Sequence, residues 1–135
     1  MKLIKKYAGL LLMLTLLVGF TSCEDDEDLE ERMFGRVWVG DVGMNAVNGR
    51  ILYSEFTFDP DGFGEEYQFF RKGELYVHFR FQWYWEDRYS NNLVLDYGRN
   101  GTSYMDNVDI YRGVMTGIFY LTGDSEGFPF ALEMQ

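Results

Sequence analysis

The chain has little of the chemistry that most enzymes and nucleic-acid-binding proteins use. Its 135 residues include one cysteine, one histidine and two prolines, and 12 basic residues stand against 22 acidic ones. A lone cysteine excludes a disulfide within one chain. A single histidine, with no second histidine and no further cysteine beside it, excludes the usual zinc sites. A formal charge of −10 at pH 7 repels nucleic acid, so we expect no DNA or RNA partner.

Long apolar runs are also scarce, and the clearest one covers residues 7–20. This run has 14 residues without a charge, whereas a membrane-spanning helix needs about 20. A permanent single-pass anchor is therefore the weaker interpretation. Lys2, Lys5 and Lys6 precede the run, and small polar residues follow it. This three-part layout is typical of a secretory signal peptide, here residues 1–22.

The only cysteine, Cys23, directly follows this segment. The A-x-A-like cleavage pattern of an ordinary signal peptide is missing, and Thr21-Ser22-Cys23 resembles a bacterial lipobox. The resemblance implies cleavage before Cys23 and lipidation of its thiol, with two or three acyl chains that hold the protein on a membrane. A buried free cysteine is the alternative, but a core cysteine does not sit between a signal-like segment and an acidic tract.

An acidic tract follows the cysteine, and residues 24–28 are all Asp or Glu. Like charges repel and stay solvated, so residues 23–33 are predicted to be a disordered tether that begins with the lipidated cysteine. The tract also resembles the surface-export signal of lipoproteins from Bacteroidota, which implies the outer membrane and display on its outer face. The acidic tract can serve as a spacer, as an export signal, or as both. Removal of residues 1–22 takes away three lysines, so 9 basic and 22 acidic residues leave a formal charge of −13.

The remaining residues, 34–135, are predicted to form one all-β domain. The clearest strand covers residues 74–86, where apolar and polar side chains alternate, as expected for a strand with one buried face. The apolar face carries Leu75, Val77, Phe79, Phe81, Trp83 and Trp85. A helix would scatter these side chains around its circumference.

Turn-forming residues divide the domain into eight short segments. They are residues 36–44, 51–58, 63–71, 74–86, 93–97, 103–111, 114–121 and 128–134. Asp59-Pro60-Asp61-Gly62 predicts a tight turn, and Asn100-Gly101 is the pair favoured in a type I′ hairpin. No connection has room for a crossover helix, which disfavours parallel pairing. We therefore predict an eight-stranded antiparallel up-and-down barrel, with a two-sheet β-sandwich as the alternative.

Four segments within residues 34–134 carry a loose resemblance to a known group. Residues 35–42 (GRVWVGDV), 56–66 (FTFDPDGFGEE), 81–86 (FQWYWE) and 93–97 (LVLDY) resemble the lipocalin-like domains of small Bacteroidota lipoproteins. Gly35 and Trp38 are separated by two residues, however, where lipocalins proper show G-x-W. The resemblance implies a lipocalin-like barrel on an outer-membrane lipoprotein.

Candidate catalytic and metal-binding patterns are weak. Asp59 to Gly62 lacks the acidic positions of an EF-hand loop, because Thr57 and Gln68 occupy the places of two ligands. Glu65 and Glu66 are adjacent, so they point to opposite faces of a strand and cannot form a glycosidase pair. With one histidine in the chain, a Ser-His-Asp arrangement would arise only by chance, so we expect no catalytic role for His78. We expect no enzymatic activity, no metal site and no cofactor.

The aromatic content is the most informative excess, at 25 of 135 residues. Eight strands enclose an interior just wide enough for side chains or one small ligand, so a filled core and an aromatic-lined pocket both remain open. The candidate ligand-binding residues are Trp38, Phe79, Phe81, Trp83 and Trp85. The favoured function is non-catalytic binding of a small apolar ligand. A protein-interaction or inhibitor module and a glycan-binding accessory lipoprotein, both acting through the outer surface, are the alternatives.

Overall fold

A computed structural model describes residues 29–135. The expected signal peptide, Cys23 and the acidic residues 24–28 lie outside the described residues. Residues 29–33 are helical, although a disordered tether was expected to continue through residue 33. Met33 is fully buried, and its carbonyl accepts a hydrogen bond from the Trp38 indole at 3.1 Å. Residues 33–135 form one compact unit, so the folded domain begins one residue earlier than expected.

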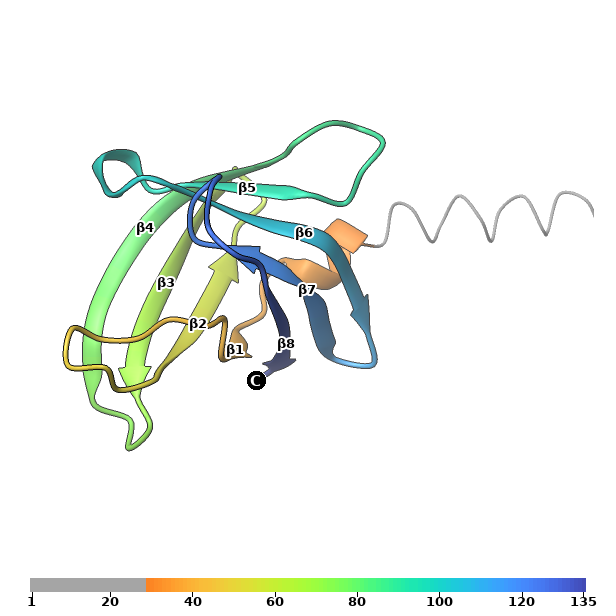
Figure 1. The fold of residues 1–135 in the computed structure, drawn as a ribbon. Helices are drawn as coiled ribbons and strands as arrows, with labels where there is room; N and C mark the ends of the chain where they lie inside the picture. The colour runs from red at the N-terminus through yellow and green to blue at the C-terminus, as the bar shows by residue number, and fades with distance from the viewer. Residues whose placement is uncertain (1–28) are drawn as a thin grey trace, which may run out of the picture. The chain divides into compact units, whose positions relative to one another are not determined.

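The domain is an all-β barrel of eight antiparallel strands in sequence order (Figure 1). The strands are β1 (Trp38–Gly40), β2 (Leu52–Phe58), β3 (Phe63–Phe70), β4 (Leu75–Trp85), β5 (Leu93–Asp96), β6 (Thr102–Tyr111), β7 (Val114–Tyr120) and β8 (Phe128–Met134). Within residues 29–135, no helix has both the length and the apolar character that a membrane crossing requires.

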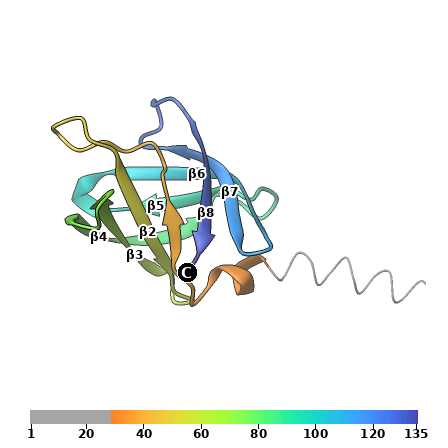
Figure 2. The ribbon, with the colours of Figure 1, turned by 90° about the horizontal axis from the view of Figure 1, so that it is seen from below.

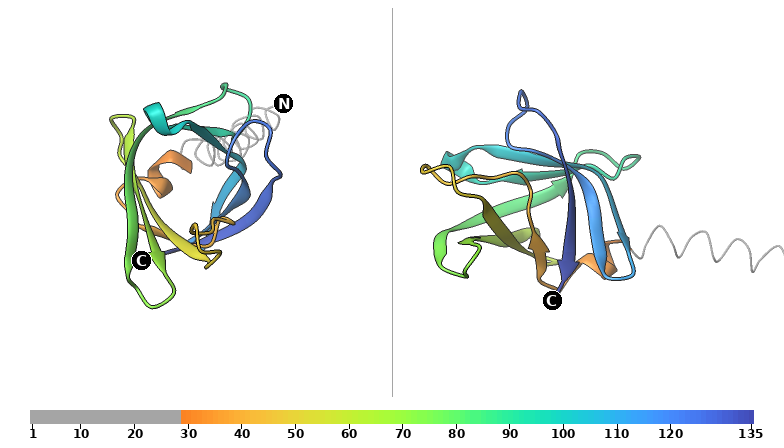
Figure 3. Two further views of the ribbon diagram at one scale, coloured as in Figure 1. Left: turned by 60° about the vertical axis from the view of Figure 1, so that its left-hand side comes forward. Right: turned by 60° about the horizontal axis from the view of Figure 1, so that its bottom comes forward.

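The barrel is closed by its first and last strands. β8 pairs with β1 through Trp38↔Met134 and Val39↔Glu133, and β1 also pairs with β2. Figure 2 shows β1 between these two neighbours, and the left view of Figure 3 shows the strands closing into a ring. Closure confirms the up-and-down barrel and excludes the sandwich, because no pair of sheet edges is left open.

The first strand and one turn differ from the sequence expectation. β1 covers three residues of the expected segment 36–44, because the Asp41 side chain accepts the Gly43 amide at 2.7 Å and starts a turn. The prediction of a type I′ turn at Asn100-Gly101 is wrong. A short 3₁₀ helix, η1 (Gly98–Asn100), precedes Gly101, and Asn100 does not adopt the positive φ that a type I′ turn requires.

The interior at one end of the barrel is filled by aromatic side chains. Phe58 lies at 5.6 Å from Phe81 and 6.2 Å from Trp83 between ring centroids, both in edge-to-face arrangements. Phe56 and Trp38 are fully buried. Rings in such edge-to-face pairs stabilise a core beyond the area they bury.

Candidate functional site

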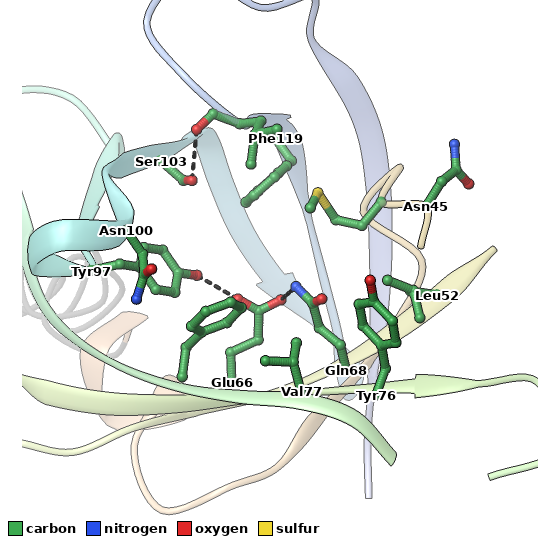
Figure 4. Close-up of a pocket in the computed structure, with 13 residues that line it drawn as sticks. Asn45, Leu52, Glu66, Gln68, Tyr76, Val77, Tyr97, Asn100, Ser103 and Phe119 are labelled. Atoms are coloured by element: carbon green, nitrogen blue, oxygen red, sulfur yellow. Dashed lines mark hydrogen bonds between the residues drawn. The ribbon is translucent and has the colours of Figure 1, made fainter. Parts of the chain in front are cut away.

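A cavity of about 530 Å³ occupies the part of the interior that the aromatic core does not fill. Thirteen residues line it (Figure 4). Met44 and Asn45 come from the connection between β1 and β2, Asn100 from η1, and Leu121 from the connection after β7. Leu121 is about half exposed. The cavity therefore lies within the barrel and is edged by three connections.

Most of the cavity wall is apolar or aromatic. Eight of the thirteen side chains are of this kind: Met44, Leu52, Tyr76, Val77, Phe79, Tyr97, Phe119 and Leu121. Those on strands come from β2, β4 and β7, and β2 and β4 also carry rings of the aromatic core. A wall of this kind binds apolar groups by removing them from water.

The polar part of the wall centres on Glu66, which is 2% exposed. Three neutral groups donate hydrogen bonds to its carboxylate (Figure 4 shows two of them). The Tyr97 hydroxyl donates to Oε1 at 2.6 Å. The Ser54 hydroxyl and the Gln68 amide donate to Oε2 at 2.7 and 2.8 Å. A buried carboxylate is tolerated when donors of this kind replace the water that it has lost.

Strand pairing directs Glu66 into the barrel. β3 pairs with β2 in the register Phe58↔Gly64 and Phe56↔Glu66, and Phe56 and Phe58 are both core residues. Paired residues of neighbouring strands project on the same side of a sheet. Gly64, Glu66 and Gln68 therefore face the interior, which gives β3 a polar inward face.

The electrostatics of the cavity are dominated by this one carboxyl group. The pKa of Tyr97 is raised well above its ordinary value of 10.0 by burial, then by the charge of Glu66 and by their hydrogen bond. The phenol therefore stays protonated and keeps donating to Glu66. None of the thirteen lining residues, all within the described part of the chain, is lysine, arginine or histidine.

Of the five residues predicted to bind a ligand, the structure places one in this cavity. Phe79 lines it, whereas Trp38, Phe81 and Trp83 are buried in the aromatic core. Trp85 packs edge-to-face on Trp83 at 6.3 Å and does not line the cavity. The indole nitrogen of Trp83 donates to the Asp59 carbonyl at 3.0 Å. These rings build the core beside the cavity.

The prediction that Glu65 and Glu66 lie on opposite faces is confirmed. Glu65 is on the outer face of the barrel, where its Oε1 lies 3.0 Å from His78 Nε2 and accepts the Tyr67 hydroxyl at 3.0 Å. The Tyr67 and His78 rings stack at 4.1 Å. The pKa of Glu65 is lowered by the hydrogen bonds from Tyr67 and then from His78. The two adjacent carboxyl groups therefore belong to separate environments.

The Asp59–Gly62 segment is a turn, as predicted. The Gly62 amide donates to the Asp59 carbonyl at 3.1 Å, and the Asp61 side chain accepts the Phe63 amide at 3.1 Å. In the described residues, no three His, Cys, Asp or Glu side chains are grouped so that they could hold a metal ion.

The polar residues of the cavity were not identified from the sequence. They include Glu66, Gln68, Tyr97 and Ser103 in the wall, and Ser54 behind it as a donor to Glu66. One signal was present: Gly64, Glu66 and Gln68 alternate along a segment whose other face carries Phe63, Tyr67 and Phe69.

The fold and the site together define a small closed up-and-down β-barrel with an apolar cavity and one buried carboxylate. Comparison of the chain with protein-family models, curated proteins and solved structures found no match.

Proposed function

We propose that this protein is a lipid-anchored lipoprotein of a Gram-negative cell envelope whose barrel binds a small, largely apolar ligand. The observation that carries the binding role is the internal cavity of about 530 Å³. Binding sites for small molecules are typically clefts of about 300–1,000 Å³ with mostly apolar walls and a few fixed polar groups. The cavity matches this description in size and in composition.

The polar network supports a binding site more than a simple packing defect. Ser54, Gln68 and Tyr97 hold the Glu66 carboxylate in one orientation at the cavity wall. Genuinely empty cavities are apolar, whereas binding sites carry a few fixed polar groups that orient the ligand. The arrangement therefore favours one orientation of a bound molecule.

The residues of the cavity also support a role without catalysis. Glycoside hydrolysis needs two carboxyl groups across a cleft, and Glu66 is the single carboxyl group among the described residues that line this cavity. Nucleophilic catalysis by a serine needs a neighbouring base such as histidine. The Ser54 hydroxyl donates to Glu66, and none of the described residues that line the cavity is a histidine. Binding is the activity that these groups support best.

The envelope location is supported by sequence alone. Its basis is the signal-like segment 1–22, the lipobox-like residues before Cys23 and the acidic run 24–28. The resemblance to Bacteroidota lipoproteins favours the outer membrane, with the acyl chains as the membrane contact.

Binding can be tested on residues 24–135, which include the whole compact unit 33–135. We expect the neutral fluorophore Nile red to bind at one saturable site. Val77→Trp should abolish this binding, because Val77 faces the cavity (Figure 4). Tyr84→Trp is the matched control, since Tyr84 lies on the same strand and is 53% exposed.

Native mass spectrometry of the same protein provides a second measurement. A discrete added mass that is lost on denaturation would identify the ligand. If Nile red shows no saturable binding, or binds the wild type and Val77→Trp equally, the proposal of a cavity ligand is wrong.

A further inference from the structure

The Glu66 carboxylate keeps one position for a further hydrogen-bond donor. An ionised carboxylate has about four acceptor positions on its two oxygens. Oε2 accepts two hydrogen bonds, from Ser54 and Gln68, and Oε1 accepts one, from Tyr97. The second position on Oε1 has no partner among the described residues. Because Glu66 lines the cavity, a donor on a bound molecule can reach this position.

Within residues 29–135, no Lys, Arg or His side chain forms an ion pair with Glu66. Its three partners are a hydroxyl, an amide and a phenol, all neutral. The phenol stays neutral because its ionisation is opposed by burial and by Glu66 itself. The three hydrogen bonds make the buried charge tolerable, and an opposite charge beside it would stabilise it further. A cationic molecule in the cavity would supply that charge in a medium of low dielectric constant, where the attraction is strong.

The rings near Glu66 favour the same kind of ligand. Tyr97 packs edge-to-face on Phe79 at 5.7 Å, and both rings line the cavity. Aromatic faces attract cations through their quadrupole, and they also cover the apolar part of a ligand. The cavity thus offers an apolar wall with negative charge at one place.

We propose that the natural ligand is a cationic amphiphile, a largely apolar molecule with one protonated amine that binds Glu66. This inference rests on the proposed function and adds the chemical class of the ligand. A neutral alcohol would use the same position on Oε1 but would leave the charge uncompensated, and a carboxylate would be repelled.

Three probes with the same alkyl chain separate a cationic, a neutral and an anionic head group, namely decylamine, decanol and decanoate. Their affinities for residues 24–135 can be measured by isothermal titration calorimetry. We expect decylamine to bind at least about tenfold more tightly than decanol, which corresponds to about 1.4 kcal/mol, and decanoate to bind most weakly. The common chain isolates the effect of the head group.

The variant Glu66→Gln should remove the preference. Decylamine should bind at least about tenfold more weakly, and the ratio of the decylamine affinity to the decanol affinity of the same variant should fall to about one. Glu65→Gln is the matched control, because it removes the same charge from the adjacent residue on the outer face. This control should leave all three affinities unchanged, which separates Glu66 from the general attraction of an acidic protein for cations.

A second variant keeps the test decisive if Glu66→Gln does not fold. Gln68 already donates to Glu66 at 2.8 Å, so Gln68→Lys would supply a cation from the protein itself. We expect it to lower the ratio of the decylamine affinity to the decanol affinity. The amine assignment is wrong if decanol binds the wild type as tightly as decylamine does, or if the preference for decylamine persists in both variants. In either case the proposal that the cavity binds a ligand is still supported. If neither Nile red nor any of the three probes binds, both proposals are wrong.

Discussion

At the scale of single residues, the barrel holds a carboxylate and a phenol in contact inside a protein interior. The Tyr97 hydroxyl lies 2.6 Å from Glu66 Oε1, and the pKa of Tyr97 is raised above 10.0 by burial and by Glu66. The unfolded chain has neither effect. The pair therefore links folding to pH on the alkaline side.

Tyr97 predicts a specific loss of stability at high pH. As the pH rises above 10.0, the phenol ionises in the unfolded chain but stays protonated in the folded one. The unfolded state then binds fewer protons, so the free energy of unfolding falls as the pH rises. Below 10.0 the contribution of Tyr97 is fully present. Tyr97→Phe should make the decline shallower by about 1.4 kcal/mol per pH unit.

Urea unfolding across this alkaline range measures the effect. Other tyrosines contribute equally to the wild type and to Tyr97→Phe, so they cancel in the comparison. Tyr84→Phe, at an exposed position, is the control and should follow the wild type. Parallel declines for the wild type and Tyr97→Phe would show that this phenol is not linked to alkaline unfolding.

At the scale of strands, β3 is held close to both of its neighbours at Gly64. A Cβ atom there would lie 2.5 Å from Phe81 Cε1 and 2.5 Å from the Thr57 carbonyl oxygen. The backbone oxygen cannot rotate away as a flexible side chain could. Glycine at this position therefore permits the approach of three strands around the aromatic core.

Gly64→Ala should lower the free energy of unfolding by about 1–3 kcal/mol or more, the usual cost of overpacking. Gly123→Ala is the matched control, because no heavy atom lies within 4 Å of its added Cβ and its φ is not in the left-handed region. The control should change stability by less than about 0.5 kcal/mol. Urea unfolding of the two variants tests this, and equal stabilities would contradict the packing argument.

The strands themselves were predictable, but the orientation of β3 was not. Turn residues bracket each strand, and β4 shows its buried face by alternation from Val77 to Trp83. In β3 the aromatic residues Tyr67 and Phe69 lie on the outer face, and Glu66 and Gln68 face the interior. Hydrophobicity alone would predict the reverse, with the aromatic side chains inside. The orientation of β3 is set by its register with β2, in which Glu66 pairs with the core residue Phe56. This register involves residues on two different strands, so the sequence of β3 alone does not reveal it.

At the scale of the whole molecule, aromatic side chains fill one part of the barrel interior, and a cavity occupies another part. The sequence could not distinguish a filled interior from a pocket, because the answer depends on where the rings pack. Phe56, Phe58 and Phe81 cluster in one part of the interior, which leaves the space around Glu66 open. The tryptophans were expected beside a ligand, yet Trp38 and Trp83 are buried in the core, where such large rings bury much apolar area.

The proposed envelope location rests on lipidation of Cys23, which lies outside the described residues. Cys23→Ala should release the protein from the membrane fraction and move it from the detergent phase to the aqueous phase on partitioning, because two or three acyl chains are lost. Deletion of residues 24–28 is the matched control, since it retains Cys23 and should leave the protein in the detergent phase. Mass spectrometry of the control should show the mass of the lipid. Retention of Cys23→Ala in the membrane would mean that the apolar run 7–20 anchors the chain and that Cys23 is not lipidated.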